Sequence, residues 1–221
     1  MYPTAKQLEF PEWQTDGMQI TVYDPKKRCS IGIAFDSFSF TQDSRYVEQE
    51  RDYVLQAARL IPSGLKVDRF LRLGLRRWYL TAVDIEFENL ASILNVKFFS
   101  NDDRLLRVLP EKFEDLTYVS INSENSHTAR ITVGPMRKKE IPGYIQVDKE
   151  HHLERQHAAE KYLELVKNYP EIALYMDIDY FRSFEEPTQV DVEAFYGTAA
   201  KRISEMAMGI NEYVFSTRLE A

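Results

Sequence analysis

The segment LYMDIDYF, residues 174–181, places two carboxylates, Asp177 and Asp179, two positions apart inside an apolar run. Carboxylate oxygens are the ligands that Mg²⁺ prefers, and paired carboxylates of this kind serve metal-dependent phosphoryl chemistry. A metal-dependent phosphoesterase or nuclease-like enzyme is therefore one hypothesis. A working centre needs a further acid, and no motif fixes one beside the pair. The acids that the sequence offers are Asp36, Asp148, Glu185 and Glu186.

The same segment also has the pattern of a half-buried strand, because side chains alternate between the two faces of a strand. One face carries Leu174, Met176, Ile178 and Tyr180, which predicts a core face, and the carboxylates occupy the other. The segment LRLGLRRW, residues 71–78, shows the complementary pattern. Its core face carries Leu71, Leu73 and Leu75, and its other face carries Arg72 and Arg76.

If these two strands are neighbours, Arg72 and Arg76 meet Asp177 and Asp179 across the sheet. Cross-strand pairs of opposite charge contribute about 0.2–1 kcal/mol each, so their main value would be to fix the register between the strands. We favour these ion pairs over the metal site, because the arginines compete for the same carboxylates.

Other chemical signals are weak. In HHLERQH, His152 and His157 are five positions apart and His151 and His157 are six, whereas two zinc ligands on a helix need a spacing of four. His127 falls in a predicted turn with no partner beside it, and Cys29 has no nucleophile motif around it. Phosphate-binding loops and Gly-x-Ser-x-Gly are absent from the sequence, so we predict no catalytic residue and no cofactor.

Aromatic residues are numerous, with 13 Tyr, 13 Phe and 2 Trp. Such residues build large cores, and they are also enriched at the centres of protein interfaces. We take Trp78, Tyr79 and Tyr175 as a candidate interaction surface, with a large aromatic core as the alternative.

Composition limits the class of protein. The net charge of −7 argues against nucleic acid as a partner, since binding to phosphates needs an excess of Lys and Arg. No apolar run approaches the ~20 residues of a membrane span. One cysteine and an N-terminus without a secretory signal lead us to expect a cytoplasmic protein.

The elements that carry these residues recur in one order, strand, strand, helix, strand, helix. In the first half we expect a hairpin around Asp24–Lys27, a helix from Asp43 or Ser44 that ends at Pro62-Ser63-Gly64, a strand over 65–81 and a short helix over 84–94. In the second half we expect a hairpin with its turn at 123–126, a strand at 143–150, a helix over 151–170, a strand over 171–184 and a long helix to Phe215, capped by Thr188 with Asp191. The buried stripe predicted for this last helix comprises Val192, Phe195, Ala199, Ile203, Met206, Ile210 and Tyr213.

This order predicts a single compact α+β domain over residues 1–221. We expect two similar halves, approximately 15–99 and 112–217, forming a mostly antiparallel sheet with helices packed on one face.

The Gly-Leu-Arg segment at 74–76, the Asp-Ile-Asp strand at 177–179 and a closing helix that ends in NEYVF at 211–215 resemble a family. It is a sporadically distributed prokaryotic family of uncharacterised proteins, and the resemblance spans residues 35–215. An aromatic residue follows the Gly-Leu-Arg segment here as in the family, as Trp78, but the family's Asn after it and a His in the closing helix have no counterpart. The resemblance implies no activity, because the family has none established. We therefore expect a non-enzymatic binding or protein-interaction protein, with a protein partner or a second copy of itself.

Overall fold

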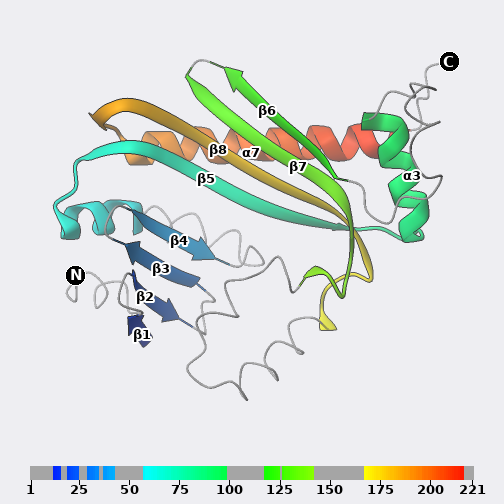
Figure 1. Cartoon of the computed structure of the whole chain (residues 1–221), viewed down its shortest axis with the longest axis horizontal. Coiled ribbons are helices and arrows are strands. Elements are labelled where there is room, and N and C mark those ends of the chain that lie inside the picture. The colour runs from blue at the N-terminus through cyan, green and yellow to red at the C-terminus, as the bar shows by residue number, and fades with distance from the viewer. Residues whose placement is uncertain are drawn as a thin grey trace, which may run out of the picture. The chain divides into compact units, whose positions relative to one another are not determined.

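The structure is a computed structural model that describes residues 12–15, 19–24, 29–34, 37–42, 57–98, 117–124, 126–141 and 167–216. It has the predicted α+β class, with antiparallel sheets and helices packed on sheet (Figure 1). Contacts divide the chain into two compact units. The first takes the described residues of 1–71 and 184–196, and the second takes those of 72–146, 156–183 and 197–216.

The first unit contains a four-stranded sheet in chain order, β1 (Glu12–Thr15), β2 (Gln19–Asp24), β3 (Cys29–Ala34) and β4 (Phe38–Gln42). The predicted hairpin is confirmed, since Asp24 pairs with Cys29 across the β2–β3 ladder. The core of this unit forms where Ile31 of β3 meets Ala57 and Ile61 of a helix at 57–65. All three residues are at most 2% exposed, so the helix is held by its apolar face.

The helix at 57–65 ends at Leu65, one residue beyond the stop predicted at Pro62-Ser63-Gly64. The Val67 N–H donates to the Pro62 carbonyl at 2.9 Å, and the Lys66 N–H donates to the Ser63 carbonyl at 3.2 Å. This is the Schellman arrangement of a helix end, in which the residue after the helix adopts a left-handed conformation. Lys66 does so with φ 57°, in a position where glycine is usual.

The second sheet has the strand order β5-β8-β7-β6, built from β5 (Arg69–Ala82), β8 (Ile172–Gln189), β7 (His127–Arg137) and β6 (Tyr118–Glu124) (Figure 1). β6 and β7 form the predicted hairpin, with Glu124 opposite His127 and only residues 125 and 126 between them. Ser126 has φ 64°, as the tight two-residue turns of hairpins require. β7 then pairs antiparallel with β8, with Ile131 opposite Ile178.

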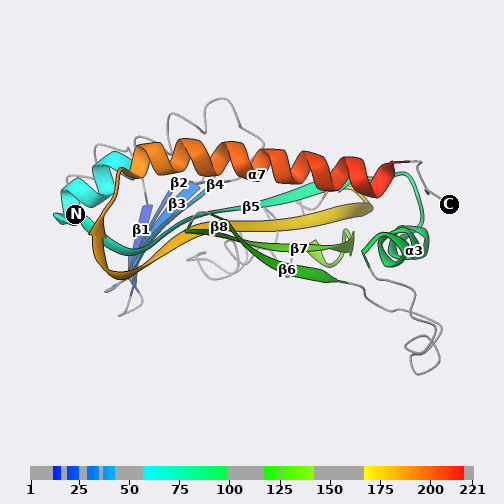
Figure 2. The ribbon, with the colours of Figure 1, turned by 90° about the horizontal axis from the view of Figure 1, so that it is seen from above.

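Helix α7 (Val192–Phe215) runs along one face of this sheet (Figure 2). The sheet buries Leu174, Met176 and Ile178 of β8 completely or almost so, as the alternating pattern predicted. Within the second unit the helix buries Ala199, Ile203, Ala207 and Val214. The predicted stripe is thus right at Ala199 and Ile203 but wrong at Tyr213, which is 49% exposed.

The start of α7 differs from the predicted capping box. Asp191 caps the helix, because its Oδ1 accepts the Ala194 N–H at 2.9 Å. Thr188 still belongs to β8, where its hydroxyl donates to the Glu186 carbonyl. The shorter α3 (Phe87–Phe98) follows β5, as predicted, and buries Phe87, Leu90, Ala91 and Leu94.

The predicted repeat of two halves is not confirmed. The first hairpin, β2–β3, lies in a sheet with β1 and β4, whereas the second hairpin, β6–β7, pairs with β8. β5, which belongs to the first predicted half, lies in that second sheet, so the strands form two sheets where we expected one. The expected strand at 143–150 and most of the expected helix at 151–170 lie outside the described residues.

Among the helices that the structure describes, none combines the length and the apolar character needed to cross a membrane.

Candidate functional site

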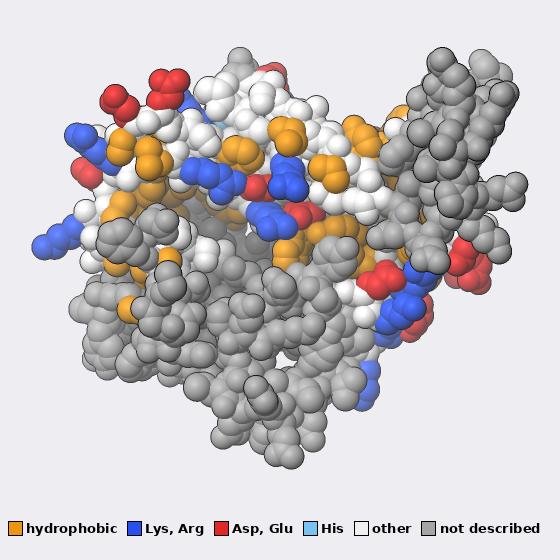
Figure 3. Space-filling view, in the orientation of Figure 1, with side chains coloured by type: hydrophobic (Ala, Val, Ile, Leu, Met, Phe, Trp, Pro, Cys, Tyr) orange, Lys and Arg blue, Asp and Glu red, His pale blue; other side chains and the backbone are white. Residues whose placement is uncertain are grey.

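The face of the second sheet away from α7, here called the outer face, carries the residues that the sequence singles out. Cross-strand partners share a face, and the register pairs Asp177 with Thr132 and Asp179 with Arg130. Figure 3 views this face and shows basic and acidic side chains meeting near its middle.

Both predicted arginines contact the predicted aspartates. The Arg76 guanidinium donates to Asp177 twice, from Nε to Oδ1 at 2.8 Å and from Nη2 to Oδ2 at 2.5 Å. Arg72 Nη2 donates to Asp179 Oδ2 at 2.8 Å. The hydrogen bond to Asp177 raises the pKa of Arg76, against the opposing effect of burial. The side chains of Asp177 and Asp179 are 12% and 23% exposed, against 56% and 52% for Arg76 and Arg72, so the arginines cover the carboxylates.

Aromatic rings hold the two guanidinium groups in place. Arg72 lies over the ring of Phe181 at 4.3 Å, and Arg76 lies over the ring of Trp78 at 5.2 Å. Such contacts favour a cation by about 0.5–1 kcal/mol at exposed sites. Each arginine therefore has both an anion and a ring as a partner, which restricts its movement.

The close packing around position 74 explains why a glycine stands between the two arginines. A Cβ at this position would lie 3.1 Å from the Cβ of Phe181 and 3.6 Å from Oδ1 of Asp179. The first distance is tighter than ordinary van der Waals contact, so the glycine permits β5 to approach β8 closely. The Gly-Leu-Arg and Asp-Ile-Asp segments are thus neighbours in space.

The alternative metal site lacks a third ligand in the part of the chain described. No group of three His, Cys, Asp or Glu side chains converges there. Asp177 and Asp179 are already hydrogen-bonded to arginines, which compete with a cation for the same oxygens. Asp36, Asp148 and the histidines His151, His152 and His157 lie outside the described residues.

The three aromatic residues proposed as an interaction surface are largely withdrawn from solvent. Tyr175 is 6% exposed and forms a core cluster with Met136 and Ile141, against which Trp78 packs. This corrects the surface interpretation, because the rings of Trp78 and Tyr175 contribute to a core. Within the described residues, the Trp78 Nε1 and Tyr79 Oη atoms are buried without a hydrogen-bond partner.

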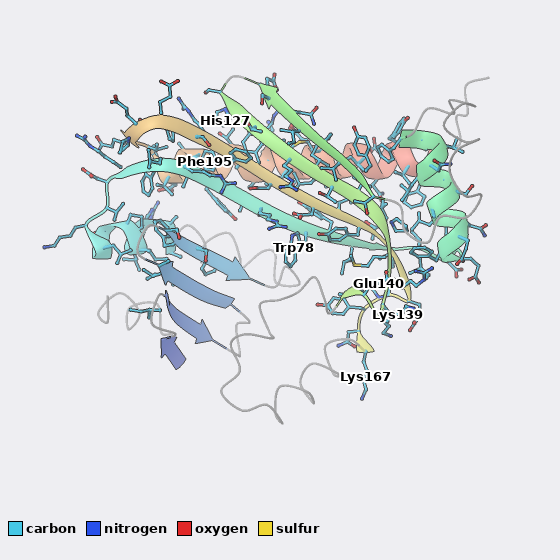
Figure 4. The ribbon with its side chains drawn as sticks, viewed as in Figure 1. Trp78, His127, Lys139, Glu140, Lys167 and Phe195 are labelled. Carbon is cyan, nitrogen blue, oxygen red and sulfur yellow. The ribbon has the colours of Figure 1, made fainter. Side chains whose placement is uncertain are left out.

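His127 was expected in a turn without a partner, but it is the first residue of β7 (Figure 4). Its ring stacks on that of Tyr180, with the ring centroids 5.4 Å apart.

Two of the three basic residues in the segment PMRKKE, residues 135–140, are paired with acids. Arg137 contacts Glu140 and Glu88, and Lys138 contacts Glu171 at 2.7 Å. The Arg137 guanidinium also lies 3.3 Å from the ring centre of Phe87. Figure 4 shows Glu140 in the turn that follows β7. Arg137 and Lys138 are therefore engaged within the second unit.

The strand β6 exposes apolar residues that the sequence patterns did not indicate as a site. It is the last strand of its sheet in the described order, and it carries Val119 and Ile121 with 50% and 69% of their surface exposed. The register places both on the outer face, since Ile121 pairs with Arg130 and Val119 with Thr132. The sequence YVSINSE alternates apolar and polar residues, which predicts a strand. It does not show that this strand is the last one described in its sheet or that its apolar side chains are exposed.

Neither the family models, nor the curated proteins, nor the solved structures with which we compared the chain contain a match. The resemblance to a prokaryotic family stays a prediction.

Proposed function

We propose that this protein is a non-enzymatic protein-interaction module of the cytoplasm, and that its binding surface is the open edge, the strand β6 from Tyr118 to Glu124. The observation that carries the proposal is the exposure of Val119 and Ile121 on a strand with no further described neighbour. Exposed strand edges bind partner segments by adding a strand, in which backbone hydrogen bonds supply affinity and side chains supply specificity.

The backbone of β6 is arranged for this mode of binding. Residues that flank a two-residue hairpin turn exchange both of their backbone hydrogen bonds, and this pattern alternates along the strands. Glu124, Asn122 and Ser120 therefore direct their N–H and C=O groups to β7. The same groups of Val119, Ile121 and Ser123 point away from the sheet, so the residues with open backbone groups include the two exposed apolar side chains.

β6 also lacks the features that prevent strand addition. Soluble proteins block exposed edges with lysines, prolines, bulges or inward charges. Residues 118–124 contain no Lys, Arg, Pro or Gly, and the ladder with β7 is unbroken from Tyr118 to Glu124. The one charge, Glu124, is engaged by Arg202 of α7 at 2.7 Å.

A selection of displayed random peptides against the purified protein tests this proposal. We expect the selected peptides to alternate apolar and polar residues, and we expect Ile121→Lys to weaken their binding at least tenfold, because it places a charge in the apolar seam. Met208→Lys is the matched control, since Met208 is 59% exposed on α7 and is not on the sheet edge. If no peptide is selected whose binding distinguishes the two variants, β6 is not the binding surface.

A further inference from the structure

We infer that the strand that adds to β6 is β6 of a second copy of this chain, paired antiparallel about a twofold axis at Ser120. The inference rests on the proposed function, because it names the partner of the same edge. It would join two second-unit sheets into one continuous sheet across the dimer.

The register follows from the positions of the apolar residues. Two antiparallel copies related by a twofold axis keep their outer faces on one side only if residues of the same parity oppose each other. With Ser120 on the axis, Val119 of one copy opposes Ile121 of the other, and the reverse pair forms as well. The neighbouring register, with Ile121 on the axis, would place Val119 opposite Ser123 and leave it without an apolar partner.

The open backbone groups fit the same register. Val119 and Ile121 both direct their N–H and C=O groups outward, so each Val119–Ile121 pair forms as a hydrogen-bonded pair. All four apolar side chains then lie together on the outer face, where each is half or more exposed in a single chain. Cross-strand contact of β-branched residues is a favoured sheet pair.

The distribution of charge allows two copies of an acidic chain to approach here. The chain has a net charge of −7, so two copies repel each other overall. β6 has one charge, Glu124, at its turn end. In this register the two Glu124 residues are eight residues apart along the strands, about 27 Å at the rise of a strand. The two Glu124 side chains therefore do not repel each other across the seam.

A cysteine on the axis gives a direct test. Ser120 opposes Ser120 of the other copy in a non-hydrogen-bonded pair, with Cα atoms about 4.5 Å apart, a distance that a disulfide spans. In a Cys29→Ser background we expect Ser120→Cys to form a disulfide-linked dimer of twice 25.9 kDa under mild oxidation. Ser123→Cys is the matched control. It also lies on β6, but in this register its two copies are about 20 Å apart and do not link.

Sedimentation equilibrium of the unmodified chain provides the second readout, with the mass expected to rise toward twice 25.9 kDa as concentration increases. Adding Ile121→Lys to Ser120→Cys should reduce the linked fraction at least tenfold. A mass that stays at that of one chain at every concentration overturns the inference, and so does equal linking at positions 120 and 123. If peptides still bind β6 while the chain stays monomeric, self-pairing fails and the proposed function survives. If peptide binding fails as well, both fall.

Discussion

The second sheet has two outer strands, and they are built differently. β5 carries four arginines, Arg69, Arg72, Arg76 and Arg77, along its length. β6 carries no basic residue and exposes Val119 and Ile121 instead. Charged side chains on an outer strand are one of the ways in which soluble proteins prevent unwanted strand addition. We therefore call β5 the protected edge and β6 the open edge.

The difference between the two edges predicts which property a substitution changes, the stability of the fold or association. On the protected edge, Arg72 and Arg76 are committed to Asp179 and Asp177, so changes there should alter the stability of the fold. On the open edge, the exposed side chains make few contacts that the fold needs. Changes there should alter association and leave the stability unchanged.

The largest expected effect is at Gly74 on the protected edge. Gly74→Val should lower the free energy of unfolding by about 1–3 kcal/mol, because its side chain would press on Phe181 and force β5 away from β8. Urea denaturation measures this loss. Leu71→Val on the same strand is the control and should change stability by less than about 0.5 kcal/mol, since Leu71, which the sequence wrongly placed on the core face, is 56% exposed. An unchanged midpoint for Gly74→Val would show that the close approach of the two strands is dispensable.

A smaller effect is expected from the ion pair of Arg76 and Asp177. Asp177→Ala should cost about 1 kcal/mol, near the upper limit for exposed pairs, because the contact is bidentate and the carboxylate is covered. A double-mutant cycle with Arg76→Ala isolates the coupling between the two side chains.

Zero coupling in that cycle would contradict a structural role for the pair. If Asp177 and Asp179 instead bound a metal ion, Mg²⁺ or Mn²⁺ would raise the melting temperature, and replacing both residues by Ala would abolish the rise. We expect no such rise.

The smallest expected effect on the stability of the fold is at Val119 on the open edge. Val119→Thr keeps the β-branched shape and replaces one methyl group by a hydroxyl. Because the dimer contains Val119 twice, the substitution should weaken dimer association by up to about fifteenfold, which corresponds to about 0.8 kcal/mol for each of the two buried apolar groups. Sedimentation equilibrium measures the association, and thermal denaturation should show no change in stability. A loss of stability comparable to that of Asp177→Ala would mean that the two edges do not differ as described.

Much of this sheet could be predicted from local patterns. The alternation around Asp177 identified the core face of β8, and the complementary charges of Arg72 and Arg76 indicated which strand lies beside it. These predictions succeed because side-chain alternation is a local property of a strand and because opposite charges mark neighbours. The two hairpins could also be predicted locally, because their turns are short and polar.

The predictions that failed depend on contacts between distant segments. Tyr175 was expected on a surface, but Met136 and Ile141 bury it from elsewhere in the chain. The exposure of Ile121 depends on what covers the outer face of the sheet around it, which no pattern within YVSINSE encodes.

Amide hydrogen exchange along β6 measures whether its outward side is an open binding edge. In dilute protein, the amides of Val119, Ile121 and Ser123 should exchange rapidly, while those of Ser120 and Asn122, which face β7, are protected. As the protein is concentrated, the first set should become protected as well. If the amides of Val119 and Ile121 are as protected as that of Ser120 at the highest dilution, another part of the same chain already covers the edge, and β6 is not an open binding edge.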